Sequence, residues 1–158
     1  MPLTIASDAF KNMGPIPARF TCDGEDLSPP LSWADVPTEA RSLALIVEDL
    51  DAPDPDAPRM TWVHWIAYNI PPTVLRLPEG AGTNNLPRGA LEGANDWHRT
   101  GYGGPCPPIG RHRYFFKLYA LNTVLTDLRR PSKTRLEAAI KGHVIAQAEI
   151  VGTYQKKH

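Results

Sequence analysis

Two stretches of the sequence concentrate side chains that could bind or transform a ligand. The first is a group of aspartates followed by a histidine within an aromatic run: Asp49, Asp51, Asp54, Asp56 and Trp62-Val63-His64-Trp65. The second is the glycine- and proline-rich run 101–110, which leads directly into Arg111-His112-Arg113-Tyr114. Each places a loop beside an apolar run with a histidine near its start, and loops held by a rigid sheet are where binding sites usually form.

The composition of the 101–110 run suits a loop that binds anions. Glycine permits positive φ and close backbone approach, and successive outward N–H groups form concavities for anions. A neighbouring histidine gains positive charge when an anion arrives. Composition alone leaves an alternative open, in which the loop only covers the end of a sheet and His64 and His112 are ordinary strand residues.

The elements that must position these residues are mainly strands. Short apolar or β-branched runs predict strands at Ser42–Asp49, Val63–Ile70, Arg113–Leu121 and His143–Tyr154. In the third run, alternation puts Tyr114, Phe116 and Leu118 on one face. One helix is predicted over Lys133–Lys141, capped by Ser132 and ended by Gly142. Strands with abundant turn residues indicate a mostly antiparallel sheet or sandwich.

The whole chain sets limits on the kind of protein. Its 158 residues fit a single domain, 1–158, better than two. Acidic and basic residues balance at 17 each, so no global field attracts nucleic acid or an anionic membrane. No stretch approaches the roughly 20 apolar residues of a membrane span. The first ten residues lack a secretory pattern, which predicts a cytoplasmic protein.

The two cysteines, Cys22 and Cys106, lie far apart in the sequence. Two are too few for a disulfide framework, and neither belongs to a metal-type Cys-x-x-Cys pair. We therefore expect free thiols in a reducing compartment. A single bridge is the alternative.

Several of these segments together resemble the phosphatidylethanolamine-binding family. Gly104-Pro105 followed by His112-Arg113-Tyr114 is similar to the family's signature loop, and the string Gly-Tyr-Gly-Gly-Pro-Cys-Pro-Pro resembles its bacterial and archaeal, Raf-kinase-inhibitor-like branch. Asp49 to Pro53 leading to Trp62-Val63-His64 resembles the family's acidic motif. Two further segments carry the same resemblance, 28–33 and 148–154.

The resemblance implies a two-sheet antiparallel β-sandwich with one or two short helices and a small, largely preformed cavity. The implied ligand-binding residues are Asp49, Trp62, His64, Gly104, Pro105, Cys106, His112 and Tyr114. His64 and His112 would donate to phosphate or carboxylate oxygens, and Tyr114 would add a hydroxyl group. Trp62 would supply an apolar wall. Asp49 would orient a histidine and hold it protonated, or meet an ammonium group of the ligand.

The sequence departs from the family pattern at two positions. Leu50 stands where the family usually has a proline, and a literal Asp-Pro-Asp-Ala-Pro occurs later, at Asp54–Pro58, so Asp54 is the alternative pocket carboxylate. Cys106 replaces the second proline of the original Gly-Pro-Pro, and a disulfide to Cys22 would reshape that wall. His98 is expected to be exposed or to lie at the rim of the site.

The function that these residues indicate is that of a non-enzymatic protein that binds phosphate, a phosphoethanolamine head group or a carboxylate. If a protonated histidine holds the anion, binding should be tighter at pH 6 than at pH 8, since free histidine titrates near 6.5. The alternative is regulation of a kinase or protease through protein contacts, as family members are associated with. A hydrolase using Cys106 and His112 is a weaker alternative. No metal and no cofactor are expected, and a homodimer is a further expectation from the branch.

Overall fold

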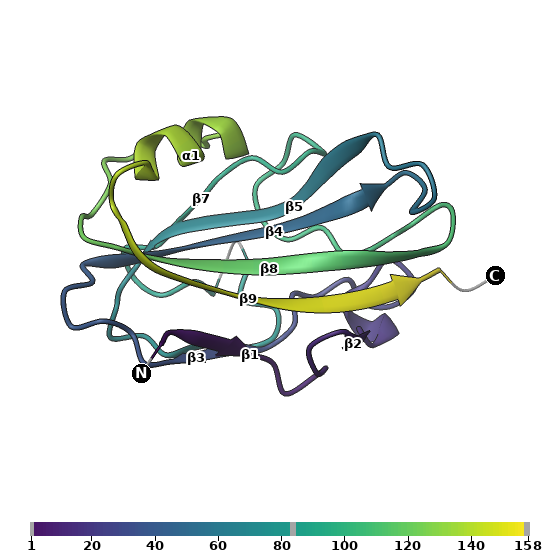
Figure 1. Ribbon diagram of the computed structural model, residues 1–158, viewed down its shortest axis with the longest axis horizontal. Helices are drawn as coiled ribbons and strands as arrows, with labels where there is room; N and C mark the ends of the chain where they lie inside the picture. Colours follow the sequence, from purple (N-terminus) through teal and green to yellow (C-terminus); the bar gives the residue numbers. More distant parts are fainter. Residues whose placement is uncertain (1, 83–84, 157–158) are drawn as a thin grey trace.

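The computed structural model describes residues 2–82 and 85–156 and contains two β-sheets with a helix outside them (Figure 1). The larger sheet has six strands in the order β2-β9-β8-β4-β5-β7, and the smaller has three in the order β1-β3-β6. The six strands are β2 (Gly14–Pro15), β4 (Ser42–Ala52), β5 (Met60–Ile70), β7 (Leu91–Glu92), β8 (Arg111–Leu121) and β9 (Val144–Gln155). The three are β1 (Thr4–Ala6), β3 (Leu31–Ala34) and β6 (Arg76–Leu77).

The central strand β4 is buried on both faces. It pairs antiparallel with β5 on one side and with β8 on the other. Leu43, Leu45 and Val47 belong to the core between the sheets, whereas Ala44 and Ile46 belong to the layer under the helix. A strand covered on both faces reads as a continuous apolar run rather than an alternating one, which explains the sequence Leu-Ala-Leu-Ile-Val.

The helix α1 (Lys133–Ile140) covers the outer face of the larger sheet over β4 and β5 (Figure 1). Ser132 caps it as predicted, because its hydroxyl accepts a hydrogen bond from Arg135 N at 3.2 Å. Leu136 and Ile140 face the sheet and are buried. A second short helix, the 3-10 turn η1 (Ala18–Phe20), lies near the amino terminus.

The predicted mostly β, two-sheet architecture with one or two short helices is confirmed. The antiparallel description needs one correction, because β2 pairs parallel with β9 at Gly14 and Pro15. The predicted alternation in β8 is also confirmed, since Tyr114, Phe116 and Leu118 are all buried on the face toward the smaller sheet. Among residues 2–82 and 85–156, no helix is long and apolar enough to cross a membrane.

Candidate ligand-binding cavity

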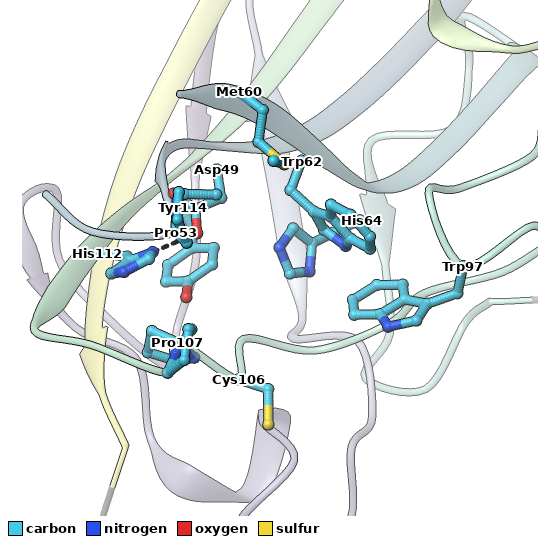
Figure 2. Close-up of a pocket in the computed structure, with 12 residues that line it drawn as sticks. Asp49, Pro53, Met60, Trp62, His64, Trp97, Cys106, Pro107, His112 and Tyr114 are labelled. Atoms are coloured by element: carbon cyan, nitrogen blue, oxygen red, sulfur yellow. Dashed lines mark hydrogen bonds and ion pairs between the residues drawn. The ribbon is translucent and has the colours of Figure 1, made fainter. Parts of the chain in front are cut away.

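A cavity of about 370 Å³ lies at the end of the larger sheet where β4 finishes and β5 and β8 begin (Figure 2). Antiparallel pairing brings these strand ends together, since Asp49 pairs with Trp62 on one side and with Tyr114 on the other. The loop before β8 closes the remaining side. The lining residues are Asp49, Ala52, Pro53, Met60, Trp62, His64, Trp97, Cys106, Pro107, Pro108, His112 and Tyr114.

Most of the residues implied by the sequence meet at this cavity. Asp49, Trp62, His64, Cys106, His112 and Tyr114 all line it. The alternative carboxylate, Asp54, is absent from the lining, and its Oδ1 accepts a hydrogen bond from Asp56 N in the loop after β4. The cavity carboxylate of this chain is therefore Asp49.

Gly104 and Pro105 are placed differently from the expectation. They lie behind the cavity wall, where Gly104 N donates to Asp26 Oδ1 at 2.8 Å and Pro105 O accepts from Cys22 N at 3.1 Å. Gly103 N donates to His64 O at 3.0 Å. Because the N–H groups of Gly103 and Gly104 are directed into the protein, the predicted anion concavity of outward backbone donors does not form at these two positions.

Asp49 and His112 form a buried pair whose polar atoms contact protein partners. His112 Nδ1 lies 2.6 Å from Asp49 Oδ2, and His112 Nε2 lies 2.8 Å from Ile109 O. Asp49 Oδ1 accepts from Asp51 N at 2.7 Å. Burial raises the pKa of Asp49, although the hydrogen bonds from His112 and Asp51 oppose the rise. Asp49 thus orients His112, and His112 is not positioned as the direct anion donor that the resemblance implies.

His64 is buried and neutral at physiological pH. Its Nδ1 donates to Gly103 O at 2.6 Å, which leaves Nε2 as the ring nitrogen available to a ligand. The pKa of His64 is lowered to about 4, mainly by burial and in smaller part by the nearby His112, while the hydrogen bond to Gly103 opposes the fall. His64 is therefore neutral in the empty site at both pH 6 and pH 8.

The hydroxyl group of Tyr114 is the exception among these buried polar atoms. No atom of residues 2–82 and 85–156 meets the distance and angle of a hydrogen bond with it, although the nearby Asp49 carboxylate acts on its pKa, and the residue is only 1 % exposed. Its ring lies between the two histidines (Figure 2), stacked on His112 at 6.3 Å and edge-to-face with His64 at 5.2 Å between ring centroids. Burial, followed by the Asp49 carboxylate, raises the pKa of Tyr114, so the phenol keeps its proton.

Trp97 is a lining residue that the sequence analysis missed. Its ring makes edge contacts with Trp62 at 5.5 Å and with His64 at 5.0 Å. The neighbouring Asp96 fixes this loop on β5, because Asp96 Oδ2 accepts from Val63 N at 2.7 Å. His98 is exposed, as one of the two expectations for it had it, and is absent from the lining. The sequence signal for Trp97 was weak, since a tryptophan in a loop of turn residues has no strand pattern to place it.

Cys22 and Cys106 form a disulfide, so the expectation of free thiols is wrong. The bond joins the segment after η1 to the cavity wall, because Cys106 lines the cavity. A thiolate nucleophile at Cys106 cannot form while this bond is intact. Within the described residues, no cluster of three or more histidine, cysteine, aspartate or glutamate side chains could hold a metal ion.

Comparison with known proteins connects this geometry to relatives. Residues 6–155 match the family model described as phosphatidylethanolamine-binding protein. A UPF0098 protein of Methanothermobacter thermautotrophicus is 48% identical over 98% of this chain and 99% of its own length. The crystal structure of a phosphatidylethanolamine-binding protein homologue from Chlamydia trachomatis is 46% identical, covers 99% of both chains and has a TM-score of 0.90. Escherichia coli YbcL is 34% identical, with a TM-score of 0.89 over 99% of this chain and 100% of its own.

Proposed function

Because this chain belongs to the phosphatidylethanolamine-binding protein family, we propose that it is a non-enzymatic binding protein whose cavity takes a small ligand by its anionic group. Phosphate, a phosphoethanolamine head group and a carboxylate all present oxygens to the same donors. A volume of about 370 Å³ lies at the small end of the range for ligand sites, which is roughly 300–1,000 Å³. The intact disulfide at Cys106 leaves no thiolate for the alternative of a hydrolase using Cys106 and His112.

The Tyr114 hydroxyl is the observation on which this function rests. It lines the cavity and has no protein hydrogen-bond partner among the described residues, so it can donate to a ligand that enters. The phenol keeps its proton, so it can donate to an anionic oxygen. Asp49 and His112 lie beside it but are hydrogen-bonded to each other. Tyr114 and His64 are therefore the polar side chains that can contact the ligand.

The charge of the cavity determines how an anion enters. His64 is neutral, and the Asp49 carboxyl group is already paired with His112. The described lining contains no lysine or arginine. An anion in such an apolar site is stabilised when a proton enters with it, either on His64 Nε2 or on the ligand's own oxygen. Ligand binding is therefore coupled to proton uptake.

The direct test is calorimetric titration with inorganic phosphate and phosphoethanolamine at pH 6 and pH 8. Affinity should be higher at pH 6, and heats measured in two buffers of different ionisation enthalpy should reveal uptake of a proton. Tyr114→Phe should lower the affinity roughly 10- to 100-fold, because a hydrogen bond to a charged acceptor contributes about 1.5–3 kcal/mol.

Tyr119→Phe is the matched control, because Tyr119 lies on the opposite face of β8, outside the cavity. It should bind as the wild type does. An affinity for phosphate that Tyr114→Phe leaves unchanged would contradict this site. If the affinity is the same at pH 6 and pH 8, ligand binding is not coupled to the uptake of a proton.

A further inference from the structure

The Cys22–Cys106 disulfide joins two exposed residues at the wall of the cavity. Both half-cystines belong to exposed residues, and they join segments separated by 84 positions in the sequence. The wall segment, residues 106–110, runs from Cys106 to the start of β8 at Arg111. Its Pro107 and Pro108 line the cavity beside Cys106 (Figure 2). A change at this bond therefore acts directly on the cavity.

The non-covalent contacts between the two segments stop just before the wall segment. Tyr102 OH donates to Phe20 O at 2.8 Å, Gly104 N donates to Asp26 Oδ1 at 2.8 Å, and Cys22 N donates to Pro105 O at 3.1 Å. Beyond these, Pro107 and Pro108 have no N–H to donate. The disulfide is thus the covalent attachment at the beginning of the wall segment, in which Pro107 alone is buried.

The far end of the wall segment contacts the buried pair. Ile109 O lies 2.8 Å from His112 Nε2, and His112 in turn contacts Asp49. Ile109 is 52% exposed, so its side chain gives the segment little burial against the core. A wall segment released at Cys106 would lose the fixed position of Ile109 O, and with it the acceptor that orients His112.

We infer that the disulfide is a redox control point of the cavity, at which a dithiol reductant releases the wall segment and weakens ligand binding. The weakening of binding rests on the function proposed above, whereas release of the wall does not. One thiolate of the dithiol attacks a sulfur of the Cys22–Cys106 bond and forms a mixed disulfide. The second thiol then closes the reductant to its own disulfide. Two electrons and two protons pass to the protein, which keeps two thiols.

The experiment compares three forms of the full chain: oxidised wild type, wild type reduced with dithiothreitol, and Cys22→Ser. The Cys22→Ser variant breaks the bond without changing a residue of the cavity lining. Amide hydrogen exchange measured by mass spectrometry follows residues 106–113. A thiol assay establishes that dithiothreitol reduces the folded protein, and phosphate affinity is measured in parallel.

We expect two thiols per reduced chain and roughly tenfold faster exchange in residues 106–113, because a segment with few buried contacts opens locally once released. Exchange in β4 follows global unfolding, so it should stay slower than exchange in residues 106–113 in both the oxidised and the reduced protein. Phosphate affinity should fall about tenfold, since the wall must be ordered again on binding, and it should return on reoxidation. Cys22→Ser should show the same exchange rate and phosphate affinity as the reduced wild type, and dithiothreitol should change neither.

Equal exchange of residues 106–113 in the oxidised and reduced forms would contradict the proposed redox control. So would a disulfide that dithiothreitol cannot reduce in the folded protein. If exchange becomes faster but the phosphate affinity is unchanged, reduction releases the wall segment without weakening ligand binding. That outcome would contradict control of the cavity by the disulfide. If the oxidised protein binds no phosphate, the proposed function fails, and hydrogen exchange still decides whether the wall is released.

Discussion

The polar residues of the cavity are held in place by protein atoms before a ligand arrives. His112 lies between Asp49 and Ile109 O, and His64 is fixed by Gly103 O. Such groups lose little freedom on binding, which lowers the entropic cost of holding a ligand. The same contacts limit what each group can do. Asp49 and His112 set the shape and charge of the site, while Tyr114 and His64 Nε2 remain to contact the ligand.

The buried, neutral His64 predicts an acid-sensitive stability. Its pKa is about 4 in the folded protein and about 6.5 when unfolded, so between these values the unfolded chain binds more protons. The titration of His64 therefore has almost no effect on the unfolding free energy above pH 6.5, and it destabilises the fold as the pH falls toward 4. Its effect at pH 4.5 is about 2–3 kcal/mol relative to pH 7.

His64→Asn should remove that pH dependence, because its amide can still donate to Gly103 O but does not titrate. Urea denaturation of both proteins at pH 7 and pH 4.5 measures the effect. The wild type should lose more stability than the variant over this interval. His98→Ala, which alters an exposed histidine next to the cavity, should behave as the wild type. If the wild type and His64→Asn lose the same unfolding free energy between pH 7 and pH 4.5, the pKa of His64 is not lowered in the folded protein.

The candidate site could be predicted where its residues lie at the ends of long strands. Asp49, His64 and Tyr114 end or begin apolar runs, and antiparallel pairing must bring such ends together. Trp97 and the disulfide were missed because both depend on how loops distant in sequence fold over the sheet. Gly104 was misplaced for a similar reason, since its partner Asp26 lies 78 positions away. Loop composition does not reveal such a partner.

At the level of elements, the loop before β8 and the loop carrying Trp97 are packed closely together. A Cβ added to Gly103 would lie 2.3 Å from Cζ3 and 2.6 Å from Cε3 of Trp97. Gly103 also exchanges two hydrogen bonds with His64, through its N–H and its carbonyl oxygen. The absence of a side chain at this position is therefore what lets Trp97 reach the cavity.

Gly103→Ala should displace the Trp97 ring, because a methyl group and an aromatic ring cannot share that space. The free energy of unfolding should fall by roughly 1–3 kcal/mol, as for other overpacked sites. Phosphate affinity should fall as well, and tryptophan fluorescence should change. Denaturation, calorimetry and emission spectra measure the three effects.

A second variant separates this contact from a general loss of folding. Gly103→Ala/Trp97→Ala removes the ring that the new methyl group would strike, so the clash disappears. Its stability should equal that of Trp97→Ala alone, which would give a coupling energy between the two positions. If Gly103→Ala is equally harmful with and without the Trp97 ring, the close contact is not its cause.

At the level of the whole molecule, the larger sheet was predictable and the smaller was not. The long strands β4, β5, β8 and β9 carry clear apolar or β-branched runs. The strands β1, β3 and β6 have 3, 4 and 2 residues, too few for a repeating pattern to appear. Their position depends on tertiary contacts such as the 2.7 Å hydrogen bond from Trp33 Nε1 to Val74 O. The resemblance to a known family therefore supplied the second sheet.

The disulfide also acts on the stability of the whole fold. It closes a loop with a sequence separation of 84, so it restricts the unfolded chain, and the loop-entropy relation gives roughly 4–5 kcal/mol. Urea denaturation of oxidised wild type and of Cys22→Ser/Cys106→Ser should therefore differ by up to this amount. Because the sheets keep their own cores on both faces of β4, the variant should still fold cooperatively.

The denaturation slope distinguishes the origin of the difference. An effect on the unfolded chain should raise the slope in the variant, because an unfolded chain without the cross-link exposes more surface. A variant of unchanged stability would show that strain or residual structure offsets the loop entropy. A variant that loses its β-sheet circular dichroism would show that the wall segment supports the whole sandwich, and the bond could then not act as a local control on the cavity.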